Sequence, residues 1–469
     1  MKRYLSVCVF MLSAILLLTS CLSDDDDNTY PSDAAIIGFS LGNLNRQMTT
    51  KAKNGSDSTY IATISGNDYK FYIDQLNYQI YNPDSLPYGT NVKRVLCTIT
   101  SKNSGMLTIK SLTSDTLNIY NSKDSIDFSQ PRIVKAYSLD GKNEVSYTVN
   151  VNVHKEMPDT FIWHSTEPAE VFTQATAMKA FHLNGRIFVF ASYEFEGAIY
   201  SCEESNDPDW QLEMWDLGFA IPQDIHENVA ANDDKIYVNV AGGIYYTTDG
   251  THWDQCGEMC PGKLVGATNH SLYAMVEGGI ARSDDEGLNW ETEQLDTDPI
   301  MLPTDDVSFV RIPSRVNESV DNIVILGNRS NYFFPDDINA FVWNKVDDED
   351  DKDLPWMYVS REDQLKNSLP RLSALSATVY NGSILAAGGP GIGACDNAGF
   401  EQFYQSFEGG IFWLNSKTLK LPIDLECCNA FAMTVDSHNN IWLICGGTGI
   451  VWRGRMSGDS TSPQKAFTE

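Results

Sequence analysis

The segment 390–408 combines aromatic side chains with hydrogen-bonding ones, a combination suited to binding sugars. It is a 19-residue insertion between the glycine pairs at 388–389 and 409–410. Long loops inside compact repeats are often functional, and sugar rings stack on aromatic rings while their hydroxyls pair with carboxylates and amides. We therefore predict a binding loop here; the alternative is a loop packed on itself with its phenylalanines buried. The predicted binding residues are Asp396, Asn397, Phe400 and Tyr404.

Two further motifs pair a hydroxyl, a carboxylate, a glycine and a tryptophan at fixed spacing. In such a turn the hydroxyl and the carboxylate accept backbone N–H groups, the glycine supplies a left-handed backbone position, and the tryptophan is buried between strands. Both motifs resemble the Asp boxes of BNR-type propellers, which implies a structural role at the rim of a propeller. They are Thr247, Asp249, Gly250 and Trp253, and Ser283, Asp285, Gly287 and Trp290.

The segment Arg311-Ile312-Pro313 resembles the arginine motif of sialidases, which also carry Asp boxes. In that family the motif precedes the Asp boxes, whereas here it follows both. Other glycosidases need two carboxylates about 5–10 Å apart, and 63 acidic residues leave no basis for choosing a pair. We therefore assign no catalytic residue, although a glycan-active hydrolase remains an alternative.

Metal and cofactor sites are not indicated. The seven histidines form no HxxxH or HxH pair, and no CxxC pair occurs among the cysteines. The acidic run at 347–353 has enough carboxylates for calcium but lacks the glycine and spaced ligands of an ordered loop, so we expect a solvated surface loop. A formal net charge of −30 also makes nucleic acid and anionic lipid headgroups poor partners.

The first 33 residues have the features of an export and anchoring signal. Two basic residues precede an apolar stretch, and residues 18–21 (Leu-Thr-Ser-Cys) resemble a bacterial lipobox. That resemblance implies a signal peptide at 1–20, a lipid on Cys21 and an acidic tether at 21–33. The four aspartates at 24–27 resemble the tract that directs Bacteroidetes lipoproteins to the outside of the outer membrane. Ordinary signal cleavage and a plain solvated linker are the alternatives.

Residues 34–155 show short apolar runs separated by turn-forming residues, which predicts a β-sandwich. The run ends in an Asp140-Gly141 turn followed by strict alternation from Val145 to Val153, typical of a half-buried strand in a hairpin. This ending resembles the final hairpin of small immunoglobulin-like modules.

Beyond residue 159 a turn dipeptide followed by an apolar strand occurs six times, at a mean spacing of about 51 residues, which is close to that of four-stranded propeller blades. Glycine pairs at the ends of several of these strands resemble kelch-type blades. We predict a six-bladed β-propeller at 160–456, followed by a tail at 457–469, in which Thr160–His164 completes the last blade; a seventh blade is the alternative. The six anchor residues are Ile187, Ile236, Leu272, Ile323, Ile384 and Ile441.

The chain as a whole resembles uncharacterised Bacteroidetes surface lipoproteins that join an immunoglobulin-like module to a kelch/BNR-like propeller. We therefore expect an all-β protein without a cofactor, attached to the outer membrane by its lipid anchor. The leading hypothesis is non-enzymatic binding of a glycan or a neighbouring surface protein through the propeller face. A hydrolase acting at the propeller mouth and a structural or adhesion platform are the alternatives.

Overall fold

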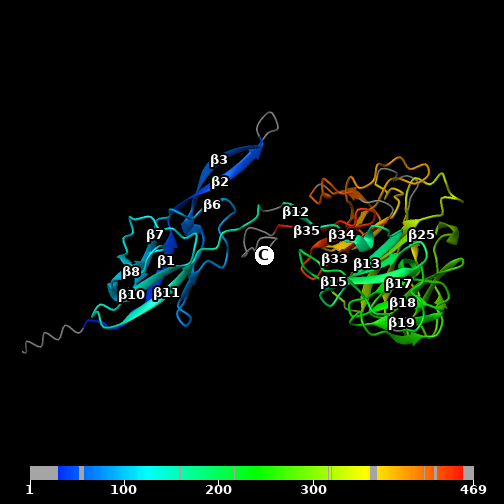
Figure 1. Cartoon of the computed structure of the whole chain (residues 1–469), viewed down its shortest axis with the longest axis horizontal. Helices are drawn as coiled ribbons and strands as arrows, with labels where there is room; N and C mark the ends of the chain where they lie inside the picture. The colour runs from blue at the N-terminus through cyan, green and yellow to red at the C-terminus, as the bar shows by residue number, and fades with distance from the viewer. Residues whose placement is uncertain are drawn as a thin grey trace, which may run out of the picture. The chain divides into compact units, whose positions relative to one another are not determined.

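The computed structural model describes residues 30–51, 57–157, 160–215, 217–314, 316–317, 319–359, 367–416, 418–426 and 430–457. Cys21, the signal peptide, most of the acidic tether and residues 458–469 lie outside these ranges. The chain divides into two compact units, whose main segments are Met1–Pro158 and Asp159–Ser457 (Figure 1). Among the described residues, no helix has the length and apolar character needed to cross a membrane.

The described residues of the first unit form three sheets around one core. Ile36, Ile80, Val134 and Val149 are fully or almost fully buried in this core. The sheets are β1 (Ile36–Leu41) with β7 (Cys97–Ser101); β3 (Asp57–Ser65), β2 (Asn43–Lys51) and β6 (Thr90–Asn91); and, in spatial order, β4 (Tyr72–Asp74), β5 (Gln79–Tyr81), β11 (Glu144–Asn150), β10 (Arg132–Tyr137), β8 (Leu107–Lys110) and β9 (Leu117–Ile119). Two short 3-10 turns, η1 (Gly66–Asp68) and η2 (Lys102–Ser104), connect strands.

The hairpin predicted at the end of this unit is present. β10 and β11 pair antiparallel, and Gly141 in the connecting turn has the left-handed φ of 72° that glycine adopts without strain. Tyr147 and Val149 face the core, as the alternating sequence pattern predicts. The other edge of β11 pairs in parallel with β5.

The described residues of the second unit form six four-stranded sheets. In chain order the first five are β13 (Ala177–Leu183), β14 (Arg186–Ser192), β15 (Gly197–Glu203) and β16 (Gln211–Leu212); β17 (Val229–Ala231), β18 (Ile236–Val240), β19 (Gly243–Thr247) and β20 (Asp254–Gly257); β21 (Lys263–Ala267), β22 (Leu272–Val276), β23 (Gly279–Ser283) and β24 (Glu291–Thr292); β25 (Asp305–Pro313), β26 (Val320–Asn328), β27 (Phe341–Asp348) and β28 (Met357–Tyr358); and β29 (Ser376–Tyr380), β30 (Ser383–Ala387), β31 (Tyr404–Ser406) and β32 (Leu414–Asn415). The sixth contains β33 (Phe431–Val435), β34 (Ile441–Cys445), β35 (Val451–Met456) and β12 (Phe161–Ser165).

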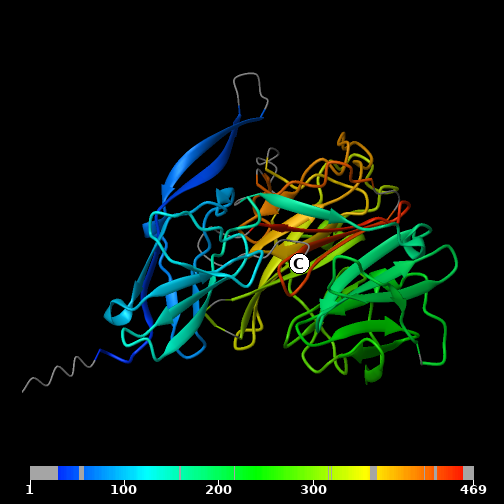
Figure 2. The ribbon, with the colours of Figure 1, turned by 60° about the vertical axis from the view of Figure 1, so that its left-hand side comes forward.

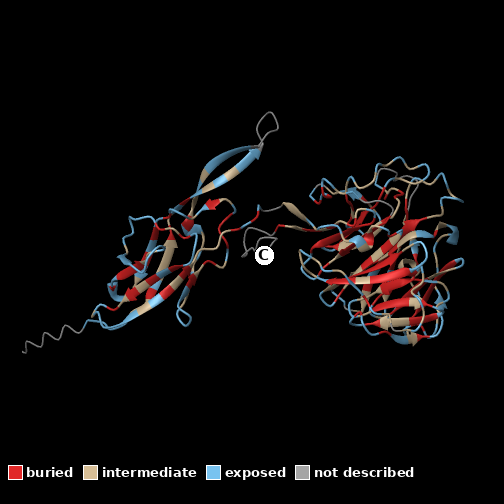
Figure 3. Cartoon of the chain, in the orientation of Figure 1, coloured by how far each residue is buried: buried red, intermediate tan, exposed pale blue. Residues whose placement is uncertain are grey.

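The sheets are arranged as in a β-propeller, with the first strand of each lying near the axis. β33 packs against β13 and β29, β25 lies between β21 and β29, and β17 packs against β21 (Figure 2). Small residues occupy these crowded strands, including Ala180 in β13 and Ala267 in β21. The strands are largely buried, and the exposed residues gather in the connecting loops (Figure 3).

The sixth sheet draws its outer strand from the beginning of the unit. β12 pairs antiparallel with β35, so that Phe161 lies opposite Met456 and Ser165 opposite Trp452. This confirms the pairing predicted from the sequence, with bounds shifted by one residue. β12 therefore covers the outer edge of β35, which would otherwise be unpaired.

Candidate functional site

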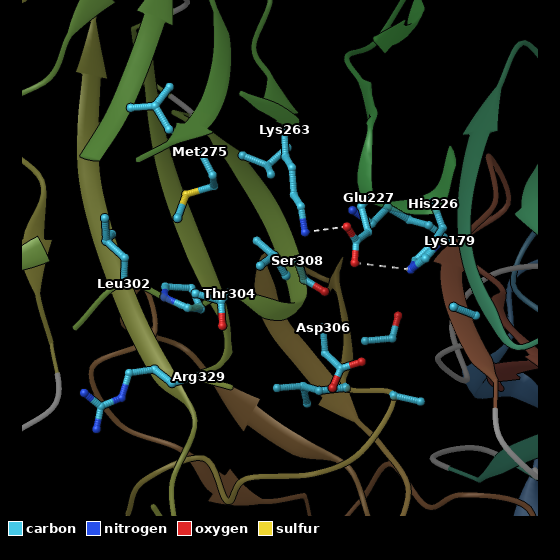
Figure 4. Close-up of a pocket in the computed structure, with 18 of the residues that line it drawn as sticks. Lys179, His226, Glu227, Lys263, Met275, Leu302, Thr304, Asp306, Ser308 and Arg329 are labelled. Carbon is cyan, nitrogen blue, oxygen red and sulfur yellow. Dashed lines mark ion pairs between the residues drawn. The ribbon is translucent and has the colours of Figure 1, made fainter. Parts of the chain in front are cut away.

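A cavity of about 440 Å³ opens at one end of the ring of first strands (Figure 4). Its lining comes from the beginnings of first strands in all six sheets, or from the residues just before them. Two 3-10 turns, η4 (Ile225–Glu227) and η5 (Pro299–Met301), and the loops after β22 and β26 complete the wall. The cavity is thus formed jointly by segments spread over more than 250 residues of the chain. Polar residues of the lining include Lys179, His226, Glu227, Lys263, Thr304, Asp306, Ser308 and Arg329.

One wall carries two cations, a carboxylate and a histidine. Lys263 forms an ion pair with Glu227, and Nε2 of His226 lies 3.9 Å from Oε1 of Glu227 (Figure 4). Nδ1 of His226 is 2.5 Å from Oγ of Ser192, a hydrogen bond that fixes the ring. Burial, together with the neighbouring Lys179 ammonium, lowers the pKa of His226 to about 4. The imidazole is therefore neutral at physiological pH.

Lys179, in strand β13, forms no hydrogen bond or ion pair through its ammonium with any residue that the structure describes. Its side chain points into the cavity beside His226 and Glu227 (Figure 4). Burial lowers the pKa of Lys179 to about 8; Glu227 opposes this shift and Lys263 adds to it. The cavity thus holds a cation that the protein leaves without a direct partner.

Asp306 faces this wall from the beginning of β25. Its backbone has a φ of 52°, and the β25–β26 register shifts between Asp305 and Ser308, which together mark a bulge at the cavity. Nδ2 of Asn328 donates a 2.9 Å hydrogen bond to Oδ2 of Asp306. Burial raises the pKa of Asp306 to about 6; the Asn328 bond opposes this shift, whereas Asp305 and Glu227 add to it.

The remaining wall is apolar. Val265, Met275, Leu302 and Phe431 line it, and all but the half-buried Met275 belong to the buried core. A cavity with one polar and one apolar side matches ligands that have a face of C–H groups and an edge of hydroxyls.

The loop between β26 and β27 borders the cavity and exposes two aromatic rings. Arg329 and Phe334 of this loop line the cavity, with the guanidinium 3.7 Å from the ring centre of Phe334. Arg329 is held by Asp337 through hydrogen bonds of 3.0 and 2.8 Å. Tyr332 and Phe333, which lie between Arg329 and Phe334 in the sequence, are 87% and 72% exposed, and their ring centres are 5.0 Å apart. An exposed aromatic pair of this kind offers a stacking surface.

The insertion at 390–408 lies against that loop, since the backbone N–H of Ala394 donates to the carbonyl of Pro335. Its predicted binding residues do not form the expected surface. Tyr404 is only 7% exposed within the core, and its hydroxyl accepts a 2.9 Å hydrogen bond from Nδ2 of Asn397. The Phe400 ring packs 5.1 Å from that of Phe431, and only Asp396 is exposed. The stacking platform predicted on Tyr404 is therefore wrong, because strand β31 turns this ring inward.

The first Asp-box motif forms the turn predicted from its residue types. Oγ1 of Thr247 accepts a 2.8 Å hydrogen bond from the N–H of Gly250, and Oδ1 of Asp249 accepts from two later backbone N–H groups at 2.7 and 3.0 Å. Burial raises the pKa of Asp249, but the hydrogen bonds outweigh it and hold the pKa far below its usual range. Gly250 has a φ of 83°, and Trp253 is buried in the core.

The second motif repeats this chemistry. Oγ of Ser283 accepts from the N–H of Gly287 at 2.8 Å, and the φ of Gly287 is 92°. Oδ1 of Asp285 accepts from the N–H of Asn289 at 2.8 Å. Trp290 is half-buried and donates through Nε1 to the carbonyl of Gly287 at 3.2 Å. None of these residues lines the cavity.

Arg311, from the sialidase-like motif, also has a structural role. Its Nε donates to Asp321 at 2.6 Å and its Nη1 to Asp233 at 2.7 Å. The guanidinium therefore neutralises two aspartates, and the residue does not line the cavity.

Two acidic groups outside the cavity are occupied by protein partners. In the trio Glu204, Asp436 and His438, whose ligand atoms lie within 4.8 Å of one another, Asp436 accepts from Arg453 at 2.8 and 3.0 Å. Asp347 was expected in a solvated loop but is buried in β27, where Tyr273 donates to it at 2.7 Å. Side-chain contacts from other sheets draw this aspartate inside, which the local charge run could not indicate.

The cavity residues were missed by sequence reasoning. Lys179 and Asp306 are 127 positions apart in chain numbering and belong to no motif. The signal that could have found Lys179 is a charged residue in the middle of an otherwise apolar first strand, between Met178 and Ala180.

Residues 157–459 match the family model described as the DUF6242 beta propeller domain, and residues 39–151 match that of the DUF6242 N-terminal domain, a domain of unknown function. No curated protein matches the chain. A Trichoderma reesei carbohydrate-active enzyme of family AA12 is 11% identical, with a TM-score of 0.39, over 64% of this chain and 96% of that one. A Penicillium chrysogenum alpha-L-arabinanase is 11% identical, with a TM-score of 0.36, over 63% and 98%. A Bacteroides thetaiotaomicron protein of unknown function is 10% identical, with a TM-score of 0.40, over 78% and 94%.

Proposed function

The chain belongs to the DUF6242 family, in which an N-terminal domain precedes a β-propeller, and we propose that it is a surface lipoprotein that binds glycans in the axial cavity of that propeller. The observation that carries the proposal is the cavity itself. It is lined by the beginnings of first strands, or by the residues just before them, from all six sheets, and it joins a charged wall to an apolar one beside an exposed aromatic pair.

The two walls correspond to the two kinds of surface on a pyranose ring. The C–H face of the sugar lies against Val265, Met275 and Leu302, and its hydroxyls pair with Asp306 and Ser308 on the opposite side. Tyr332 and Phe333 stack a further sugar unit outside the cavity. Affinity for one short glycan is modest, and display of many copies on a surface compensates for it.

The proposal also includes the domain architecture and the cellular location. We interpret the six sheets as six kelch/BNR-like blades closed by β12, and the first unit as an immunoglobulin-like module. The sequence at 18–21 supports a lipid on Cys21 that anchors the protein to the outer membrane, facing outward. A neighbouring surface protein presenting a glycan is an equally suitable partner.

A glycan-active hydrolase is the second candidate, and one observation favours it. Asp306 has a pKa of about 6, raised by burial and by the neighbouring Asp305 and Glu227, which suits a proton donor facing a second carboxylate. Release of reducing ends from a bound oligosaccharide, abolished in Asp306→Asn, would establish hydrolysis. Binding without any release of reducing ends supports the non-enzymatic function.

The test of binding is a glycan array probed with the mature protein, followed by calorimetric titration of the best ligand. Thr304→Trp places a large ring at the cavity, and we expect it to abolish binding without lowering the melting temperature. Thr113→Trp, at an exposed threonine of the first unit, is the matched control. Unchanged binding in Thr304→Trp would move the site away from the cavity.

A further inference from the structure

The cations that line the axial cavity are not equivalent. Lys263 is paired with Glu227, and Arg329 is paired with Asp337. Lys179 is the cation without such a partner in the described part of the lining, although Glu227 lies close enough to influence its pKa. Its ammonium therefore retains three N–H donors for a bound molecule.

The position of Lys179 also distinguishes it from a surface lysine. In β13, Met178 and Ala180 are buried in the core, and the alternation of the strand turns Lys179 the other way, toward the axis. A half-buried ammonium without a counterion costs folding free energy. Such a charge is retained more readily where a ligand supplies the missing anion.

The opposite side of the cavity limits what that anion can be. Asp306 faces Lys179 across the cavity, and Glu227 is already engaged by Lys263 (Figure 4). A ligand with several negative charges would place some of them against these carboxylates. A ligand with one negative group at Lys179 and hydroxyls toward Asp306 satisfies both sides. The net charge of −30 repels anions at long range, so this preference must arise from local contacts.

We propose that the axial cavity selects saccharides that carry a single anionic group, a carboxylate or a sulfate, and that Lys179 donates hydrogen bonds to that group. This inference rests on the proposed glycan binding and specifies its ligand class. Asp306 and Ser308 take the hydroxyls of the same sugar unit, and Lys263 engages Glu227 in an ion pair.

The experiment uses the mature protein and three sets of probes on one array. The probes are oligosaccharides with one uronic acid unit, the same oligosaccharides after chemical reduction of the carboxyl group to an alcohol, and matched singly sulfated oligosaccharides. We expect the charged probes to bind about ten-fold or more tightly than the reduced ones, as suits one charge-assisted hydrogen-bonding group. Uronate and sulfate probes identify which anion is preferred.

Three variants assign the preference to Lys179. Lys179→Met should remove the advantage of charged over reduced probes, Lys179→Arg should keep most of it, and Lys142→Met, at an exposed lysine of the first unit, should leave it unchanged. The melting temperature of each variant shows that it is folded.

The outcomes separate this inference from the proposed function. Equal binding of charged and reduced probes, or a preference that persists in Lys179→Met, would overturn the role of Lys179 and leave glycan binding standing. Failure of every glycan on the array to bind would refute both.

Discussion

Trp163 and Gly454 are direct partners across the β12–β35 ladder, and the indole of Trp163 fills the space that a side chain at position 454 would need. A Cβ on Gly454 would lie 2.3 to 2.6 Å from three atoms of that ring. The indole Nε1 also donates a 2.7 Å hydrogen bond to the carbonyl of Lys420. The seam that closes the sixth sheet is therefore set by one glycine and one tryptophan almost 300 residues apart.

Gly454→Ala should destabilise the propeller by about 1–3 kcal/mol, because the added methyl group forces the Trp163 ring out of place. Thermal unfolding followed by tryptophan fluorescence measures the loss. In the Trp163→Ala background, Gly454→Ala should lower the stability less than it does in the wild-type background. Strictly additive effects would contradict the contact.

Asp285→Ala should lower stability by about 1–3 kcal/mol, because it leaves the N–H of Asn289 without its acceptor. Asp249→Ala should act in the same direction at the equivalent turn. Chemical denaturation provides the measurement, with Glu291→Ala at a nearby exposed site as control. Intact stability combined with lost glycan binding would refute the structural role of these aspartates.

Asp306→Asn should stabilise the folded protein at pH 7.5 and have little effect below pH 4. The folded-state pKa of Asp306 is raised to about 6, with Asp305, Glu227 and burial opposing its ionisation. The free-energy cost of ionising Asp306 in the folded state is therefore absent below the unfolded-state pKa. It grows between about pH 4 and pH 6 and is complete above pH 6. We expect a gain on the order of 1–3 kcal/mol at pH 7.5. Asp305→Asn is the control, and a gain independent of pH would contradict this account.

Lys179→Met should raise stability at pH 7 and lose this advantage as the pH increases. Because the folded-state pKa of Lys179 is lowered to about 8, the cost of its charge is complete below pH 8 and is relieved between about 8 and 10.5. The groups that influence it are Glu227, Lys263 and the neutral His226. The difference in unfolding free energy between wild type and variant, measured from pH 7 to 10, shows whether the stability advantage of Lys179→Met decreases as the pH rises. A variant that is less stable at pH 7 would show that Lys179 has a structural partner.

Asp436→Ala should cost about 3–5 kcal/mol, because it removes the buried carboxylate that accepts two hydrogen bonds from the guanidinium of Arg453. The oxygens of Asp436 are engaged by Arg453, Trp442 and Asn440. We therefore expect a chelator to leave the melting temperature of the wild-type protein unchanged. A lower melting temperature in the chelator, restored by a divalent cation, would show that Glu204, Asp436 and His438 hold a metal.

The sequence alone determined features that depend on neighbouring residues. The repeated turn and strand segments correspond to β14, β18, β22, β26, β30 and β34, because alternation and turn chemistry act over a few positions. The Asp-box turns were predictable for the same reason, since each hydroxyl and carboxylate bonds within four residues. The pairing of β12 followed from counting strands, because an incomplete sheet needs a further member.

Only the tertiary structure decided which side chains meet at the axis. Lys179 lies in β13, Glu227 in η4 just before β17, and Asp306 in β25, and they meet only because the first strands converge. The burial of the Tyr404 ring also depended on the register of β31, since a shift of one residue would turn the ring outward. Local patterns are set by bonds within a few residues, whereas a site built across sheets depends on how whole strands are placed. That placement is the reason why Lys179 is half-buried with no direct partner among the described residues, and the sequence around it indicates only an unusual charge in β13.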